Sequence, residues 1–338
     1  MKGIKAKSDD IHSLSCRSDS IAPSMKKTIK YGGIQSDLPK HKVASFSFAS
    51  CRDRIHHVHN GGDGAGASKT CISARNVTLG YGKKVVLNDI HLDVARGEFI
   101  SIIGPSGVGK STLLMAINGN VKIFGGDLVV LNHNLLTIKN GALKNIRSMI
   151  GAIYQGYHLV RRLSVLDNIA AGMLQRMSPF SAAIKYYTHD QYEQMYAYMQ
   201  TVGIEQEALQ RCDRLSGGQM QRVAIARALA QKPEMILADE PISSLDPVSA
   251  QNVMDTLARI NSQYGITVIA NLHQLDYAKD YCTRIIGINS GKIVYDGKPE
   301  CISQGVINQI YQDAKYDERR LLVAPGPYSE VPAPAYNA

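Results

Sequence analysis

The stretch "EFISIIGPSGVGKST", from Glu98 to Thr112, decides the fold of this chain. Its first half is an apolar run that ends at Gly104, as expected for a buried strand. Its second half fits the pattern G-x-x-x-x-G-K-[ST], and the apolar positions from Leu113 to Ile117 predict a helix after it. A strand, a glycine-rich loop and a helix in this order are typical of a phosphate-binding unit, so we expect an α/β domain.

The residue types of this phosphate loop, residues 104–112, suit a nucleoside triphosphate and its metal ion. Glycines let consecutive backbone amides wrap a phosphate, and we expect Lys110 to reach the β and γ phosphates. The Ser111 hydroxyl suits Mg2+, and Thr112 is expected on the side of the α phosphate. The predicted nucleotide-binding residues of the loop are Gly104, Pro105, Ser106, Gly107, Val108, Gly109, Lys110, Ser111 and Thr112.

A second motif, "ILADEP" from Ile236 to Pro241, places two acids at the end of an apolar run that predicts a strand. Ligands of open α/β sheets bind at the carboxyl ends of the strands. Hydrolysis of a nucleoside triphosphate needs an acid on the metal side and a group that orients water. We therefore assign Asp239 to the metal ion, through water, and Glu240 to the role of base or water-orienting group.

The stretch "LSGGQMQR", from Leu215 to Arg222, places two adjacent glycines at the start of a helical pattern. Ser216 can cap that helix, while Gly217 and Gly218 leave its first amides uncovered. An uncovered helix N-terminus is a site for an anion. We therefore predict that a negatively charged group approaches this backbone closely.

Several motifs in a fixed order make the chain resemble the ATP-binding subunit of ABC transporters, from about Cys71 to about Gln312. Besides the phosphate loop and the two acids, they are the signature stretch "LSGGQ" at 215–219, Gln155 in "IGAIYQ", "SSLD" at 243–246 and His273 in "NLHQ". The resemblance implies a P-loop NTPase (RecA-like) core, a small antiparallel β subdomain, and an inserted α-helical subdomain of about residues 156–215.

In this family two copies face each other head to tail, and the resemblance implies that each ATP lies between the phosphate loop of one copy and the signature stretch of the other. The residues facing the partner's ATP would be Ser216, Gly217, Gly218 and Gln219, with Asp246 at the dimer seam. Gln155 would bind Mg2+ and His273 would contact the γ-phosphate, which makes Glu240, His273, Lys110 and Gln155 the candidate catalytic residues. Tyr81 matches the aromatic side chain that stacks on adenine, with an ordinary tyrosine at a strand edge as the alternative.

The variants "EPISSLDP" and "NLHQ" depart from the usual family pattern at Ile242 and Gln274. Together with "YQGYHLVRRLSVLDNI", "VMDTL" and "IVYDGKP", they resemble the ATPases of phosphonate importers, although phosphite or another small oxyanion ester stays open as the substrate. This resemblance implies integral-membrane permease subunits docked on residues 156–175, where a subdomain core with two solvated arginines is the alternative. It further implies an indirect partner, a substrate-binding protein, and a peripheral position on the cytoplasmic face of the cell membrane.

The composition fits a folded domain with a basic extension. The 338 residues are 44% hydrophobic, and their net charge is +9. Residues 1–70 hold twelve lysines and arginines against six aspartates, lack a sustained period and end in the glycine-rich "NGGDGAGAS", so we expect them to be disordered, with His56, His57 and His59 incidental. We also expect a flexible tail at 313–338. The six scattered cysteines indicate reduced thiols.

Two other functions stay open at this stage. A soluble ABC ATPase acting on nucleic acid or ribosomes is favoured only by the basic extension, and the second cassette or long coiled coil typical of such proteins is not found in this sequence. A regulatory subunit that does not hydrolyse ATP is disfavoured because Glu240 and His273 are both present. We therefore expect no nucleic-acid partner.

Overall fold

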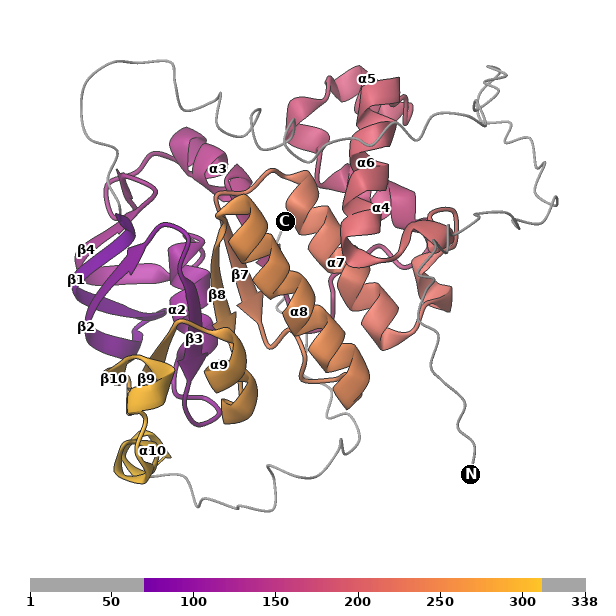
Figure 1. The fold of residues 1–338 in the computed structure, drawn as a ribbon. Helices are drawn as coiled ribbons and strands as arrows, with labels where there is room; N and C mark the ends of the chain where they lie inside the picture. Colours follow the sequence, from indigo (N-terminus) through magenta and orange to yellow (C-terminus); the bar gives the residue numbers. More distant parts are fainter. Residues whose placement is uncertain (1–69, 312–338) are drawn as a thin grey trace, which may run out of the picture. The chain divides into compact units, whose positions relative to one another are not determined.

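A computed structural model describes residues 70–311, and these residues form two β-sheets surrounded by helices (Figure 1). The predicted basic extension, its histidines, its glycine-rich stretch and the predicted tail at 313–338 lie outside the described residues. Thr70, which we expected in the extension, is the first residue of strand β1. None of the helices within 70–311 is long and apolar enough to cross a bilayer.

The larger sheet carries the phosphate loop. Its strand order is β10-β9-β3-β8-β7-β6, and only β10 runs antiparallel to its neighbour. The strands are β3 (Phe99–Ile103), β6 (Ile150–Ile153), β7 (Met235–Asp239), β8 (Thr267–Asn271), β9 (Arg284–Asn289) and β10 (Lys292–Gly297). Because β3, β6, β7 and β8 are parallel, the loops that follow them meet at one edge of the sheet.

The smaller sheet is antiparallel, with the order β2-β1-β4-β5. Its strands are β1 (Thr70–Tyr81), β2 (Lys84–Ala95), β4 (Lys122–Val130) and β5 (His133–Asn134). Strand β1 pairs with β2 on one edge and β4 on the other. It buries Ile72 and Ala74 before an irregularity in its pairing with β2, and Val77 and Leu79 after it, so the buried positions change from even to odd numbers.

The helices lie between and around the two sheets. They are α2 (Lys110–Ile117), α3 (Asn140–Ser148), α4 (Val165–Ala171), α5 (Pro179–Ala183), α6 (His189–Val202), α7 (Gly217–Ala230), α8 (Pro247–Tyr264), α9 (Leu275–Tyr281) and α10 (Gln304–Tyr311). Short 3-10 turns complete them: η1 (Leu174–Arg176), η2 (Glu205–Glu207), η3 (Cys212–Arg214) and η4 (Pro299–Cys301). Helix α2 packs on both sheets, whereas α4, α5 and α6 form the inserted helical region beside α7.

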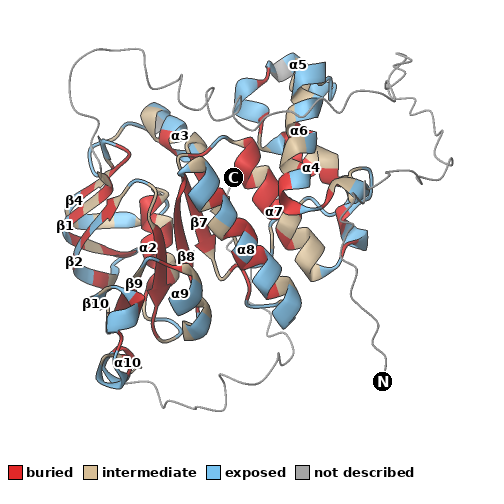
Figure 2. Ribbon diagram, viewed as in Figure 1, coloured by how far each residue is buried: buried red, intermediate tan, exposed pale blue. Residues whose placement is uncertain are grey.

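The larger sheet, with β3 in it, lies between two clusters of the hydrophobic core. Figure 2 shows that its strands β7 and β8 are buried. Ile100 and Ile102 pack in one cluster with helix α2 and the smaller sheet. Phe99 and Ile103 pack in the other with α7, α8 and the helical region. All five residues of β3 are buried, as the apolar run in the sequence predicts. The phosphate loop therefore leaves a strand that is fixed on both faces.

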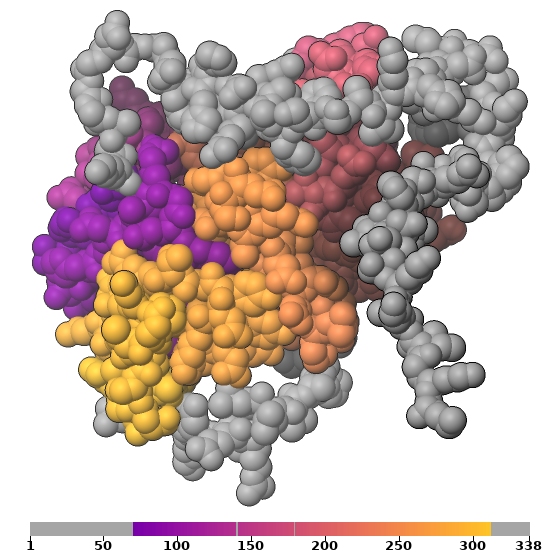
Figure 3. Space-filling view, viewed as in Figure 1, coloured from indigo at the N-terminus to yellow at the C-terminus, as the bar shows by residue number. Residues whose placement is uncertain are grey.

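Both ends of helix α8 carry residues that favour these positions. Asp246 caps its first turn by accepting a hydrogen bond from the Ser249 amide at 2.9 Å. Gly265 ends it with φ of 65°, in the left-handed region where glycine costs least. Val253, Leu257 and Ile260 form its buried face, and its outer face lies at the surface, in orange in Figure 3.

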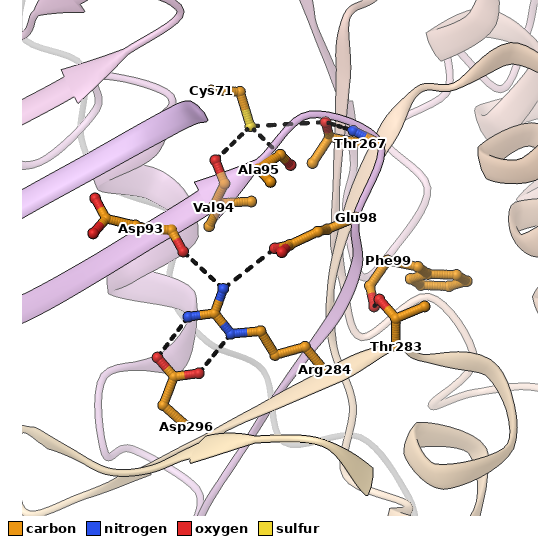
Figure 4. A network of polar contacts seen from close by, with 11 residues as sticks. Cys71, Asp93, Val94, Ala95, Glu98, Phe99, Thr267, Thr283, Arg284 and Asp296 are labelled. Carbon is orange, nitrogen blue, oxygen red and sulfur yellow. Dashed lines mark hydrogen bonds and ion pairs between the residues drawn. The ribbon is translucent and has the colours of Figure 1, made fainter. Parts of the chain in front are cut away.

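A polar network joins the two sheets beside the start of β3 (Figure 4). The guanidinium of Arg284 donates to both carboxylate oxygens of Asp296 at 2.6 and 2.7 Å, to Glu98 at 3.3 Å and to the Asp93 carbonyl at 2.8 Å. Asp93 belongs to the smaller sheet, whereas Arg284 and Asp296 belong to the larger one. The bond to the Asp93 carbonyl therefore connects the larger sheet to the smaller one.

Candidate nucleotide-binding site

The phosphate loop needs glycine at defined positions. Gly104, Gly107 and Gly109 have φ of 149°, 79° and 111°, which other residues rarely adopt. A Cβ on Gly104 would lie 2.2 Å from the Ile288 carbonyl oxygen, and one on Gly109 would lie 2.6 Å from the Leu87 side chain. At Gly107 nothing would lie within 4 Å, so the middle of the loop is open.

The backbone amides of this loop form a row of uncommitted donors. No residue within 70–311 accepts a hydrogen bond from the amides of Gly107 to Thr112. The first bond of helix α2 runs from the Leu113 amide to the Gly109 carbonyl, at 3.0 Å. Successive free N–H groups at a helix N-terminus attract an anion, and the row is long enough for several phosphate oxygens.

Lys110, whose amide belongs to this row, is buried, with 4% of its surface exposed. Its Nζ donates to the carbonyl oxygens of Gly104 and Pro105, both at 2.8 Å. Burial lowers the pKa of Lys110, and the charges of Glu240 and Asp239 oppose that shift. The ammonium has no ion pair with a carboxylate among the described residues. A desolvated cation in this position gains most from an anionic ligand.

The predicted metal residues gather at the carboxyl edge of the larger sheet. The Ser111 hydroxyl donates to Asp239 Oδ1 at 2.9 Å, as expected for two groups that share a ligand. Gln155 is exposed and follows β6 by two residues, and β6 pairs with β7, the strand that ends at Asp239. A hydroxyl, a carboxylate and an amide are oxygen donors that suit Mg2+, so these side chains fit the ion.

Glu240 and His273 form a close pair at the same edge. His273 Nε2 lies 2.6 Å from Glu240 Oε1, and the Glu240 amide donates to the Asn271 carbonyl at 3.2 Å. The hydrogen bond from His273 lowers the pKa of Glu240, and this effect exceeds the opposing effect of burial. Glu240 also has φ of 50°, an uncommon conformation for this residue type. Its carboxylate is thus ionised and held in place.

The signature stretch begins helix α7. Ser216 and Gln219 cap it reciprocally: the Gln219 amide donates to Ser216 Oγ at 3.3 Å and the Ser216 amide to Gln219 Oε1 at 2.9 Å. The cap predicted at Ser216 is therefore confirmed. In the described part of the chain, nothing accepts a hydrogen bond from the amides of Gly217 and Gly218. This N-terminus keeps two donors for an anion.

The glycines of the signature stretch also have neighbours within the chain that the sequence does not predict. A Cβ on Gly218 would lie 2.8 Å from Ser249 Oγ, and one on Gly217 would lie 3.0 Å from Tyr157 Oη. The Tyr157 hydroxyl lies 3.1 Å from Ser244 Oγ. Close packing within the chain is therefore a second reason for glycine at these positions, besides the approach of an anion.

The structure separates the predicted residues into two groups. Hydrogen bonds connect the phosphate loop with Asp239, but no bond between described residues joins the loop to residues 216–219. Asp246, the cap of α8, lies on the side of the signature stretch, because Ser249 contacts both. Tyr81 is 47% exposed at the end of β1, and its hydroxyl lies 3.4 Å from Met115 Sδ of α2.

The sequence patterns did not predict a role for the residue that holds Asp239. Asn271 is fully buried at the end of β8 and donates from Nδ2 to Asp239 Oδ1 at 2.7 Å. The signal was present in the sequence, because a polar residue ends the apolar run "ITVIAN" two positions before His273. Its role depends on which strands neighbour β8, and the strand order is not readable from the run itself.

The sequence matches the ABC transporter family over residues 87–243. A curated relative, the phosphonates import ATP-binding protein PhnC of Lactobacillus delbrueckii subsp. bulgaricus, is 43% identical over 75% of this chain and 99% of its own. The protein of the same name from Rhizobium johnstonii is 44% identical over 70% of this chain and 85% of its own.

Solved structures share the fold. The dimeric ATP-binding cassette MJ0796, bound to ADP and Pi, is similar with a TM-score of 0.60 and 31% identity, over 68% of this chain and 98% of its own. CbiO1 of Clostridium perfringens, described as part of the ABC transporter complex cbiONQ, is similar with a TM-score of 0.63 and 26% identity. The similarity covers 72% of this chain and 94% of CbiO1. These similarities confirm the predicted resemblance and the predicted P-loop NTPase fold.

Proposed function

The chain belongs to the family of ABC transporter ATP-binding proteins, and from this premise we propose that it is the ATP-hydrolysing subunit of a phosphonate importer. The observation that carries the nucleotide site is the row of uncommitted amides from Gly107 to Thr112, together with the buried side chain of Lys110 in the same loop. These groups favour a polyphosphate, whose charge the ammonium and the amide dipoles balance.

Hydrolysis is assigned to the pair at the sheet edge. The depressed pKa of Glu240 keeps its carboxylate ionised at neutral pH, so it can orient the attacking water and accept its proton. His273 holds Glu240 through the 2.6 Å contact and supplies a ring nitrogen beside the γ-phosphate position. Lys110 stabilises the charge that develops on the transferred phosphoryl group.

The residues that would hold Mg2+ are Ser111, Asp239 and Gln155. When bound, this ion neutralises charge on the phosphates. Asp239 Oδ1 already accepts the Ser111 hydroxyl, which keeps both groups at one point of the loop. Gln155 lies at the start of the helical region, so a change in its position can reach residues 156–175.

We further propose that two copies share each ATP. The free amides of Gly217 and Gly218 form a second anion site, and no described hydrogen bond brings it to the phosphate loop of its own chain. A related solved cassette is dimeric and bound to ADP and Pi. Gln219 and Asp246 flank the shared site in this arrangement, and Tyr81 stacks on adenine.

The transport assignment rests on the relatives. Both curated relatives described above are phosphonate import proteins, so we propose permease subunits as partners, with residues 156–175 as their surface, and a substrate-binding protein as an indirect partner. The protein would then sit peripherally on the cytoplasmic face of the cell membrane. Uptake of methylphosphonate and of phosphite, measured in cells that depend on this subunit, tests the substrate. Uptake of phosphite without uptake of methylphosphonate would replace phosphonate by phosphite as the assigned substrate.

Glu240→Gln tests the hydrolytic assignment. The amide keeps the size and loses the charge, so ATP should still bind while hydrolysis falls at least ~100-fold, typical of the loss of a general base. Because hydrolysis separates the two copies, the variant should accumulate as an ATP-bound dimer in size-exclusion chromatography. Normal hydrolysis by this variant would remove Glu240 from the catalytic role.

Ser216→Arg, added to Glu240→Gln, tests the shared site. The bulky cation would block the approach of the partner's phosphate, so the ATP-bound dimer should disappear. Ser262→Arg is the matched control, because Ser262 is an exposed serine near the end of α8. A Ser216→Arg double variant that dimerises like the control would assign the signature stretch a purely structural role.

A further inference from the structure

Asn271 joins three parts of the site, although the sequence assigns no role to this first residue of "NLHQ". It ends strand β8 between β3, which leads into the phosphate loop, and β7, which ends at Asp239. In the sheet register Asn271 faces Asp239 on one side and Ile102 on the other. Its side chain has no exposed surface. A fully buried amide in this position costs free energy unless its hydrogen bonds are made.

The amide nitrogen of Asn271 fixes one oxygen of Asp239. Asn271 Nδ2 lies 2.7 Å from Asp239 Oδ1 and 3.4 Å from Ser111 Oγ. The Ser111 hydroxyl donates to the same carboxylate oxygen at 2.9 Å. Asp239 Oδ1 thus accepts two hydrogen bonds, and Oδ2 accepts none from the residues described here. The arrangement leaves Oδ2 as the oxygen free for a cation.

The amide oxygen of Asn271 has no partner. The donor nitrogen must face the carboxylate, because the reverse orientation would place two oxygens against each other. Oδ1 is therefore buried and makes no hydrogen bond within residues 70–311. An unmade bond of this kind is costly in a packed sheet, and a donor from a ligand would satisfy it. Mg2+ usually keeps several waters, and these waters are hydrogen-bond donors.

We propose that the Asn271 side chain is a positioning residue for the divalent cation of the nucleotide. Its Nδ2 holds Asp239 so that Oδ2 is presented to the ion, and its Oδ1 accepts a hydrogen bond from the ion's water. The inference rests on the proposed Mg·ATP site and adds a residue to it. The backbone carbonyl of Asn271 separately accepts the Glu240 amide at 3.2 Å, so side-chain variants leave that contact in place.

Binding of Mn2+ to the ADP-bound protein, followed by electron paramagnetic resonance, tests the proposal without hydrolysis. Asn271→Leu keeps the volume and removes both hydrogen-bonding groups. We expect its Mn2+ affinity to fall on the order of 10- to 100-fold, the range typical of residues that orient a metal ligand. ADP affinity in EDTA should match that of the wild type. Asn271→Ala serves the same test if the leucine variant does not fold.

Asn289→Leu is the matched control, because Asn289 is a buried asparagine at the end of β9 whose amide donates to the Gln309 carbonyl at 3.0 Å. Its Mn2+ affinity should equal that of the wild type. Equal Mn2+ affinity in the Asn271 variants and the control, whatever their thermal stability, would overturn the inference. A wild-type protein that binds neither ADP nor Mn2+ would instead overturn the proposed function.

A double-mutant cycle with Asp239→Asn separates positioning from direct ligation. If Asn271 acts through Asp239, its replacement should weaken Mn2+ binding much less in the Asp239→Asn background than in the wild type. Equal losses in both backgrounds would show that Asn271 does not act through Asp239 and would contradict the proposal.

Discussion

Lys110 combines burial with a positive charge, and its only partners among the described residues are two backbone carbonyls and the more distant charges of Glu240 and Asp239. A buried ammonium without a paired carboxylate is unusual, because desolvation favours the neutral form. An anionic ligand would supply the missing interaction. The same residue therefore costs stability in the free protein and gains binding energy with nucleotide, which is typical of a functional site.

Lys110→Ala should abolish ATP hydrolysis and weaken ATP binding on the order of 100-fold. Charged hydrogen bonds contribute up to about 3 kcal/mol each, and the loss of this ammonium removes its bonds to the phosphates. Isothermal titration with ATP measures the affinity, and thermal unfolding without nucleotide checks the fold. Lys84→Ala, an exposed lysine of β2, is the control and should bind ATP normally. Unchanged binding by Lys110→Ala would remove the loop from the phosphate site.

The pairing of Glu240 with His273 also belongs to the residue scale. The sequence predicts Glu240 as the base or water-orienting group, and the family resemblance implies that His273 contacts the γ-phosphate. The structure adds that the two side chains contact each other at 2.6 Å. Their separation of 33 positions gives no hint of the contact. It arises because β7 and β8 are neighbours, so the residues that follow them are brought together.

At the scale of elements, the two sheets are joined on one side by Arg284. Its side chain is 25% exposed and bonds both oxygens of Asp296, which holds β9 to β10, while its bond to the Asp93 carbonyl reaches β2. The hydrogen bonds to Asp296 raise the pKa of Arg284, so the guanidinium stays charged. The planar guanidinium matches this set of acceptors in a way that an ammonium cannot.

Arg284→Lys should lower the free energy of unfolding by about 1–2 kcal/mol, because one ammonium cannot replace the paired bonds to Asp296 and the bond to β2. Urea unfolding followed by circular dichroism measures the change. Arg75→Lys is the matched control: its ion pair with Asp93 has both side chains more than half exposed, so no measurable change is expected. Equal free energies of unfolding for the two variants would show that the hydrogen bonds of Arg284 do not stabilise the contact between the two sheets.

Sequence patterns predicted those elements whose ends are marked by a capping residue or a glycine. Ser216, predicted as a cap, gave the start of α7. The apolar run before Gly104 gave a strand buried on both faces. Strand β1 was not predicted in detail, because its side chains alternate irregularly and its partners β2 and β4 lie on either side of the phosphate loop in the chain.

The candidate site was predicted to a similar extent. Motif residues such as Lys110 and Ser111 follow from their spacing, and the structure places Ser111 against Asp239. Asn271 and Tyr157 were missed because each acts through neighbours from distant segments: Asn271 through strand order, and Tyr157 through a contact with Ser244 at 87 positions' separation. Long-range packing decides such roles, and local sequence patterns carry little information about it.

At the scale of the whole molecule, β1 belongs to the fold as an inner strand of the smaller sheet. All strands of the two sheets lie within residues 70–297 of the described part of the chain. Strand β1 is hydrogen-bonded on both edges, to β2 and to β4. Five apolar residues of β1 lie in the cluster that supports α2, namely Cys71, Ile72, Ala74, Val77 and Leu79. The residues before β1 carry much of the chain's net positive charge and show no apolar period.

Removal of residues 1–69 should therefore leave the melting temperature and ATP hydrolysis unchanged. Removal of residues 1–81, which also deletes β1, should prevent folding, because it takes the central strand from the smaller sheet and exposes the cluster around α2. Each of the larger apolar side chains of β1 contributes about 1.5–3 kcal/mol to the free energy of unfolding. Together these contributions are comparable to the total stability of a typical domain. Thermal unfolding and ATPase assays on both truncations give the comparison. Loss of hydrolysis in the shorter truncation, with the melting temperature kept, would instead assign the extension a part in nucleotide turnover.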